Sequence, residues 1–154
     1  MKYLIHLLKI IFIATIGIYN ANAQSNIRFE HLTTKDGLSI NSIFSICQDK
    51  EGFMWFGTWY GVNKYDGYSF TEFKHDPANT KTSLVNNVIN TMLEDSKGRL
   101  WLGTWEGLHL VDKVSGDITP FLNPADDWFA FNAITSLAED KQGNLWLGTY
   151  AGIH

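Results

Sequence analysis

The chain has 154 residues, of which 45% are hydrophobic and 14% aromatic, and its formal net charge at pH 7 is −4. Aromatic residues are too frequent for an intrinsically disordered chain, which is poor in them. An acidic chain without a run of Lys or Arg is also a poor candidate for binding nucleic acid or an anionic membrane surface.

Residues 1–23 have the features of a secretory signal peptide. Lys2 and Lys9 supply positive charge beside an apolar run, and the segment ends in Ala-Asn-Ala, small residues that a signal peptidase reads. We expect cleavage before Gln24, which removes two lysines, leaves residues 24–154 and changes the net charge from −4 to −6. An uncleaved anchor is the alternative, but Lys9 interrupts the apolar stretch and a membrane-spanning helix needs about 20 apolar residues.

Residues 27–32 alternate apolar and polar side chains, which indicates a half-buried β-strand. Beyond this strand the chain repeats one pattern three times, at steps of 46 and 45 residues. Each copy has an Asp-x-x-Gly turn followed by Trp-x-Gly-Thr. The Trp and Gly residues of the second element are Trp55, Gly57, Trp101, Gly103, Trp146 and Gly148. A repeat of this length, in register over three copies, predicts an array of identical supersecondary units.

Each complete copy contains four short segments with strand character, separated by turn residues. In the first copy these segments are residues 43–48, 53–58, 62–65 and 68–74. In the second copy they are residues 89–93, 99–104, 108–112 and 118–122. The third copy supplies residues 134–138 and 144–149. Four antiparallel strands in roughly 45 residues are typical of a β-propeller blade.

These elements predict an all-β fold, an incomplete β-propeller of about two and a half four-stranded antiparallel blades. The blades are expected at residues 41–77, 87–123 and 132–154, the last of them partial. Residues 27–32 alternate like the fourth strand of a blade, so we expect them to close the ring as its outer strand. Because a ring needs about four to eight blades, we expect a longer protein. The open blade face should then dock the missing blades or self-associate.

The Trp-x-Gly-Thr strands have apolar residues on both faces. A blade lies between two others, so both of its faces are covered, unlike a one-sided antiparallel sheet. We expect the repeated Trp to fill the space between sheets, and the Gly two residues later to let a neighbouring backbone or ring come close. Cys47, the only cysteine, has an apolar repeat position and is expected to be a small core residue rather than a reactive thiol.

At the level of these motifs, the sequence resembles the two-component regulator propeller repeat family. In that family each repeat has the Asp-x-x-Gly turn, the Trp-x-Gly-Thr strand and a Gly-Leu that opens the next strand. The third element reads Gly61-Val62, Gly107-Leu108 and Gly152-Ile153 in this chain. The resemblance covers essentially all of the chain after the leader.

The resemblance implies the periplasmic, ligand-sensing propeller of a hybrid two-component sensor kinase. In such proteins the propellers precede an inner-membrane span and a histidine kinase, and many respond to breakdown products of polysaccharides. This chain has no membrane segment after the leader and no Gly-rich nucleotide-binding run. We therefore expect that it does not transmit a signal by itself.

The sequence shows no catalytic constellation, and none of its motifs indicates a metal ion or a cofactor. His31, His75 and His109 have unrelated repeat positions, and no His-x-x-x-His or Cys/His cluster is found. Asp126 and Asp127 are better explained as a surface turn than as an acid/base pair. A quinone-cofactor propeller is disfavoured because the metal ligands for such a cofactor are missing.

One end of the ring is the better candidate for a binding site, because successive hairpin turns and the links between blades meet there. The residues expected on it are Trp59, Tyr60, Trp105, Glu106, Trp128 and Tyr150. Aromatic faces beside carboxylates and amides suit oligosaccharides, since a pyranose ring offers an apolar C–H face together with hydroxyls. The alternative is that Trp59, Trp105 and Tyr150 are packing residues, because they recur at one repeat position.

Two functions remain open at this point. The first is a non-enzymatic sensor module that recognises oligosaccharides or polysaccharide breakdown products. The alternative is the N-terminal part of a secreted β-propeller polysaccharide lyase or glycosidase, whose active residues lie beyond His154. A membrane span and a kinase encoded downstream would favour the sensor, and a stop after a few more blades would favour the enzyme.

Overall fold

The computed structural model of the protein describes residues 28–121 and 133–154. The chain divides into two compact units, Met1–His31 and Leu32–His154. In the first unit the described residues, 28–31, form neither helix nor strand. The predicted leader and its cleavage site lie outside the described residues.

The strand expected over residues 27–32 is not formed at residues 28–32. A strand depends on hydrogen bonds to a neighbouring strand, and none of the three sheets that the structure describes includes these residues. Alternating polarity was therefore an insufficient signal by itself. That these residues close a ring stays a prediction.

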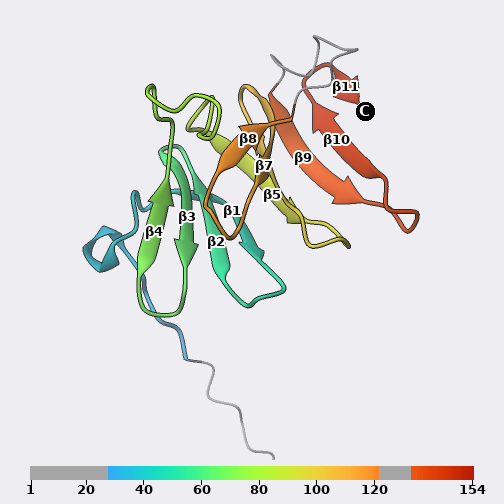
Figure 1. Cartoon of the computed structure of the whole chain (residues 1–154). Helices are drawn as coiled ribbons and strands as arrows, with labels where there is room; N and C mark the ends of the chain where they lie inside the picture. The colour runs from blue at the N-terminus through green and yellow to red at the C-terminus, as the bar shows by residue number, and fades with distance from the viewer. Residues whose placement is uncertain (1–27, 122–132) are drawn as a thin grey trace, which may run out of the picture. The chain divides into compact units, whose positions relative to one another are not determined.

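The second unit consists of antiparallel strands that follow one another in three sheets (Figure 1). The first sheet contains β1 (Ile43–Gln48), β2 (Met54–Thr58), β3 (Gly61–Tyr65) and β4 (Phe70–Phe73). The second contains β5 (Ile89–Glu94), β6 (Leu100–Thr104), β7 (Gly107–Val111) and β8 (Ile118–Pro120). The third contains β9 (Ile134–Glu139), β10 (Leu145–Thr149) and β11 (Gly152–Ile153). One short 3-10 helix, η1 (Thr34–Asp36), precedes β1.

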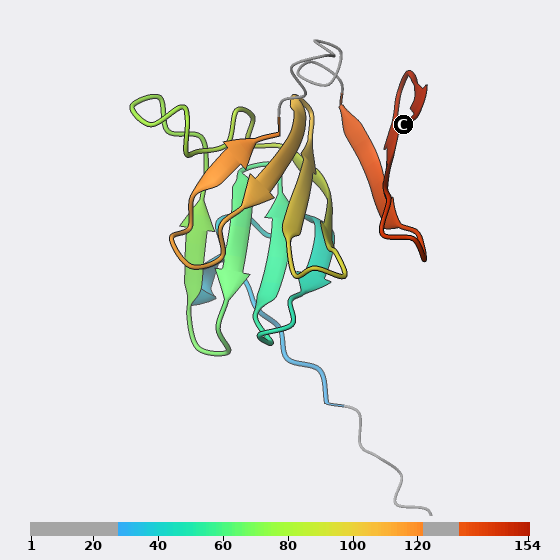
Figure 2. The same ribbon diagram turned by 45° about the vertical axis from the view of Figure 1, so that its right-hand side comes forward.

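Each sheet is a meander in which consecutive strands pair. The first strands of the sheets, β1, β5 and β9, lie next to one another, whereas β4 and β8 form the opposite edges of their sheets. The second sheet lies across the face of the first (Figure 2). This stacking around a shared inner edge is the arrangement of propeller blades. It confirms the predicted all-β, incomplete propeller, since the described sheets do not close into a ring.

Apolar side chains fill the space between neighbouring sheets. The larger core lies between the first two sheets and includes Trp55, Leu84, Ile89 and Leu102. A smaller core, with Trp101 and other residues, lies between the second and third sheets. Because the second sheet is covered on both sides, every residue of β6 is buried.

The exposed fraction of the three repeated tryptophans follows this layering. Trp55 is 0% exposed and Trp101 is 2% exposed, because each faces a following sheet. Trp146 is 49% exposed, since the described residues place no sheet against its face. The same motif therefore has a buried indole in two copies and a half-exposed one in the third.

The glycine two residues after each buried Trp receives a side chain from the next sheet. A Cβ atom at Gly57 would lie 2.7 Å from Cγ2 of Ile89, and one at Gly103 would lie 2.7 Å from Cγ2 of Ile134. Glycine is required there because any side chain would displace the neighbouring sheet. The group that approaches is an aliphatic side chain, not the backbone or ring that the sequence led us to expect.

The turn aspartate and the tryptophan of each repeat are joined directly. The indole Nε1 donates to the carboxylate at 2.8 Å in Trp55–Asp49 and at 2.9 Å in Trp101–Asp95. The other carboxylate oxygen accepts the backbone N–H four residues after the aspartate, from Phe53 and Arg99. Each aspartate thus holds both its own turn and the following strand.

Candidate ligand-binding rim

The turns between the second and third strands of the first two sheets lie at one end of the unit, beside the link from β4 to β5. The N–H of Gly61 donates to the carbonyl of Asn87 at 2.8 Å, and the N–H of Trp105 donates to the carbonyl of Val88 at 3.3 Å. The link is therefore bonded to both turns. We call residues 59–60, 86–88 and 105–106 the rim.

A threonine sets the shape of each rim turn. The hydroxyl of Thr58 accepts the N–H of Tyr60 at 2.9 Å and donates to the carbonyl of Gly61 at 2.8 Å. Thr104 makes the same two bonds with Glu106 and Gly107. Local bonds of this kind favour a tight turn over a continued strand, so the two residues after each threonine project from the end of the sheet.

Trp59 lies flat against Phe44 of β1. The ring centroids are 5.4 Å apart and the planes differ by 7°. Both side chains remain exposed. Stacking fixes the orientation of the indole, so its second face is presented to solvent in one direction.

Tyr60 lies beside a cation. Nζ of Lys74 is 5.2 Å from the centroid of the Tyr60 ring, a distance at which the ammonium group is attracted to the ring face. The same Nζ donates to Glu72 at 3.2 Å. Lys74 is thereby held next to the rim.

Trp105 is positioned by a hydrogen bond instead of a ring. Its Nε1 donates to Oδ1 of Asn90 at 3.1 Å, and Nδ2 of Asn90 donates to the carbonyl of Ile134 at 3.0 Å. Asn90 has the repeat position of Phe44, and Trp105 that of Trp59. The residue at this repeat position therefore orients the rim tryptophan by stacking in the first sheet and by a hydrogen bond in the second.

Glu106 is the carboxylate of the rim. Its Oε1 accepts Nδ2 of Asn86 at 3.0 Å, and both side chains are exposed or half-buried. Because Asn86 belongs to the link and Glu106 to the second sheet, the pair crosses from one chain segment to the other. The rim thus combines two indoles, a phenol, the amides of Asn86 and Asn87, and a carboxylate.

Of the six residues expected at this end, the structure connects Trp59, Tyr60, Trp105 and Glu106 through the link. Tyr150 has the equivalent position after Thr149 in the third sheet and is exposed. Trp128 lies outside the described residues. Trp59 stacks on Phe44 and Trp105 bonds to Asn90 within their own sheets, and both side chains stay more than half exposed. That they bind a ligand, and the alternative that they only pack, both stay predictions.

The sequence reasoning placed the link over residues 74–87 at this end, but it did not single out Lys74 or Asn86 within the link, nor Phe44 and Asn90 in the strands. The sequence held a signal for two of them, because Phe44 and Asn90 share one repeat position, fifteen residues before the rim tryptophan of their sheet. Lys74 and Asn86 do not recur and are brought to the rim by the path of the link. No single-sequence pattern marks such a contact.

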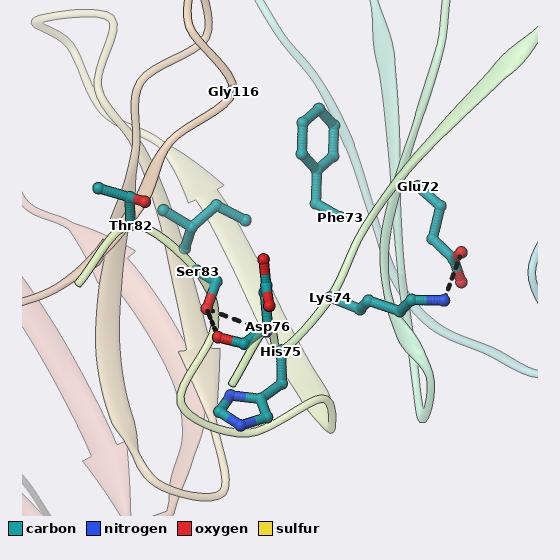
Figure 3. A pocket seen from close by; sticks show the side chains of 9 residues that line it. Glu72, Phe73, Lys74, His75, Asp76, Thr82, Ser83 and Gly116 are labelled. Carbon is teal, nitrogen blue, oxygen red and sulfur yellow. Dashed lines mark hydrogen bonds and ion pairs between the residues drawn. The ribbon is translucent and has the colours of Figure 1, made fainter. Parts of the chain in front are cut away.

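A hollow of about 390 Å³ adjoins Lys74 (Figure 3). It lies between β4, the loop after it and the turn before β8, and the Phe73 ring projects towards Gly116. Its polar groups bind the loop itself: Nδ1 of His75 contacts the carbonyl of Leu84 at 2.6 Å, and Oγ of Ser83 accepts the N–H of Asp76 at 3.0 Å. These bonds shape the loop that leads into the rim.

Within 28–121 and 133–154, no group of three or more His, Cys, Asp or Glu side chains is placed to hold a metal ion. In the same ranges no helix has the length and apolar character needed to cross a membrane.

Comparison with known proteins identifies relatives in bacterial signalling. The sequence model of the family described as two component regulator propeller matches residues 37–60, 83–106 and 129–151. A segment of 54 residues is 44% identical to part of histidine kinase P4 of Formosa agariphila. This segment makes up 35% of this chain and 4% of the kinase.

Two solved structures from B. thetaiotaomicron are similar. One is the extracellular domain of a hybrid two component system, with 30% identity, a TM-score of 0.69, and coverage of 79% of this chain and 17% of that one. The other is the extracellular domain of a one component system, with 28% identity, a TM-score of 0.65, and coverage of 84% and 17%. The chain spans less than a fifth of each relative. The chain thus carries three repeats that match the two-component regulator propeller family, and its three sheets resemble the propeller of hybrid two-component sensors.

Proposed function

We propose that this chain is part of the periplasmic, ligand-sensing region of a two-component regulatory protein, and that its rim recognises oligosaccharides. The family and the extracellular location of both similar solved domains support the sensor role. Kinase activity and signal transmission belong to other parts of such a protein.

The observation that carries the oligosaccharide assignment is the pairing of exposed indole faces with a crossing carboxylate–amide pair. Trp59 and Trp105 are each held in a fixed orientation by a partner side chain. Glu106 supplies hydrogen-bond acceptors, and the Asn86 amide supplies both donors and an acceptor. A pyranose ring stacks its C–H face on an indole while its hydroxyls bond to carboxylate and amide groups. The rim meets both requirements.

The alternative, a polysaccharide lyase or glycosidase, has weaker support. Glycoside hydrolysis ordinarily uses two carboxyl groups on either side of the scissile bond. The rim as defined contains one carboxylate, Glu106, and its Oε1 is already bonded to Asn86. A binding role suits a single anchored carboxylate better.

Calorimetric titration of the purified chain with a panel of neutral and acidic oligosaccharides tests the proposal. We expect saturable binding to at least one class, and a loss of about tenfold or more in affinity for Trp105→Ala. Tyr68→Ala is the matched control, because Tyr68 is exposed in the turn before β4, at the opposite end of the sheet. Equal affinity of both variants, or binding of another ligand class alone, would contradict the oligosaccharide assignment.

A further inference from the structure

In each of the first two sheets, one side chain of the third strand holds the segment that leads into the first strand. In the first sheet, Oδ1 of Asn63 accepts the N–H of Ser39 at 3.1 Å, and its Nδ2 donates to the Ser39 hydroxyl at 2.7 Å. In the second sheet, Nε2 of His109 accepts the N–H of Val85 at 3.2 Å. These pairs have equivalent repeat positions, so the same bond has a titratable acceptor in one copy only.

The imidazole is satisfied less well than the amide that it replaces. Because Nε2 of His109 accepts a hydrogen bond, the neutral ring carries its hydrogen on Nδ1. Nδ1 is buried and has no hydrogen-bond partner in the part of the chain that the structure describes. An unpaired buried donor destabilises a fold, whereas both polar groups of Asn63 are paired. Packing alone therefore favours asparagine at this position.

The His109 side chain lies inside the unit, between two complete sheets. It is fully buried, and Val111, two residues along β7 and so on the same face of the strand, belongs to the core between the first and second sheets. Leu84, the residue before Val85, belongs to the same core. The bond from Val85 to His109 therefore fixes the link to the second sheet at the edge of this core.

The residues that follow Val85 are those of the rim. Asn86 is paired with Glu106. The carbonyl of Asn87 accepts the N–H of Gly61, and the carbonyl of Val88 accepts the N–H of Trp105. The bond at His109 thus anchors the stretch of the link that holds both rim turns.

The elements around His109 carry few charges that can act on it. β6 and β8 contain no charged side chain. The charged or titratable side chains of the other elements are Glu106 in the turn before β7, Lys74, His75, Asp76 and Lys81 in the link, Lys64 and Glu72 in the first sheet, and Glu94 at the end of β5. Burial lowers the pKa of His109, and the Glu106 carboxylate offsets this effect only in part.

We propose that His109 is a positioning residue of the rim, whose neutral ring holds the link in place and whose protonation releases it. A proton taken up from solvent leaves both ring nitrogens as donors, so the N–H of Val85 loses its acceptor. Release of the link then separates Asn86 from Glu106 and loosens both rim turns. The effect on ligand binding rests on the proposed function of the rim, whereas the release of the link does not.

Amide hydrogen exchange followed by NMR tests the release in the ligand-free chain. Protection, corrected for the intrinsic exchange rate, should fall roughly twentyfold between about pH 7 and about pH 5, because a released ring has the ordinary pKa of 6.5 and a held ring one of about 4. The fall should appear together at the amides of Val85, Gly61 and Trp105. The Ser39 amide should change less, since its acceptor Asn63 does not titrate.

Two variants remove the titratable acceptor. His109→Asn should abolish the pH-dependent fall. If this variant does not fold, His109→Asn combined with Val85→Ser recreates the fully paired arrangement of the first sheet and should abolish the fall in the same way. His31→Asn is the matched control, because His31 is exposed in the segment before β1, and should keep the wild-type profile.

The neutral and acidic oligosaccharide panel then connects the release to binding. An oligosaccharide that binds near pH 7, added near pH 5 at about twenty times its dissociation constant at that pH, should restore most of the lost protection, because it binds the held state. If no member of the panel binds, the proposed function fails while exchange in the free chain still decides this inference. Three results would overturn it: a fall of equal size in His109→Asn, a fall confined to Val85, or an equal fall at Ser39, which would mean that the whole unit opens.

Discussion

The indole Nε1 of Trp101 lies 2.9 Å from Oδ2 of Asp95, a carboxylate whose side chain is almost fully buried. The same bond joins Trp146 to Asp140 at 3.0 Å, although that copy lies at an open face. The turn and the tryptophan strand are therefore one structural unit in every repeat. The bond does not depend on burial of the indole.

Replacement of Asp95 by alanine should lower the free energy of unfolding by about 3 kcal/mol, because it leaves the buried indole N–H and two backbone N–H groups without their acceptor. Asp95→Asn should have a smaller effect, since one oxygen remains. Urea unfolding at one protein concentration measures both. Asp112→Ala is the control, since this exposed turn carboxylate also accepts two backbone N–H groups but no indole. Equal losses at Asp95 and Asp112 would show that the indole bond contributes nothing.

Asp95 should also make stability depend on pH in acid. Burial raises the pKa of this carboxyl, but hydrogen bonds from Trp101 and Arg99 outweigh burial and lower the pKa from 3.8 to about 2. A carboxylate with a lowered pKa in the folded state stabilises above its unfolded pKa, and this stabilisation is lost as the pH falls. We expect the free energy of unfolding to fall between pH 3.8 and about 2, and this fall to be smaller in Asp95→Asn. An identical pH profile in the variant would contradict this account.

The layering of the sheets predicts different costs for the same substitution in two repeats. Trp101→Ala should cost about 3–5 kcal/mol of unfolding free energy, because it opens a cavity between covered sheets. Trp146→Ala should cost about 1–2 kcal/mol, because half of its area is already in contact with solvent. Urea unfolding at one protein concentration measures both. Equal costs would mean that Trp146 is covered in solution.

The repeat made most of the fold predictable from the sequence. Trp55, Trp101 and Trp146 recur with their turns and glycines, so the strand order and the blade-like stacking follow from the period. The bond from Trp101 to Asp95 was not predictable, because an aspartate in an Asp-x-x-Gly turn is explained by the turn alone. Residues 28–32 form no strand in the described structure, since alternation does not reveal whether a partner strand is present.

The rim was predictable only as a location. Trp59 and Trp105 follow the repeated Gly-Thr, so their end of the sheet could be inferred from the meander. Their orientation could not, because it depends on Phe44 in one sheet and Asn90 in the other.

Removal of the negative charge at the rim should weaken oligosaccharide binding without unfolding the chain. Glu106→Gln keeps the size of the side chain and an acceptor for Asn86, but it removes the charge that, in the proposed complex, strengthens the bond to a sugar hydroxyl. We expect the dissociation constant to rise roughly tenfold in the calorimetric titration. Asp117→Asn, an exposed acid at the opposite end of the second sheet, should leave the constant unchanged. A similar rise in both variants would indicate a general charge effect.

His109 is fully buried in β7, and its Nε2 accepts the N–H of Val85 at 3.2 Å. Its repeat equivalent Asn63 accepts the N–H of Ser39 at 3.1 Å in the same way. Each side chain holds the segment that leads into the first strand of its own sheet. A protonated imidazole cannot accept this bond, so the folded chain favours the neutral form of His109.

Burial lowers the pKa of His109 from 6.5 to about 4. Between these values the unfolded chain takes up a proton that the folded chain excludes, so stability falls as the pH falls from 6.5 towards 4. The loss should reach about 2–3 kcal/mol near the lower value. His109→Asn, which copies the repeat equivalent, keeps an acceptor for Val85 and should remove this loss, whereas His31→Asn, in an exposed segment, should not. Urea unfolding at several pH values across this window measures the effect, and an unchanged slope in His109→Asn would assign the pH dependence to other groups.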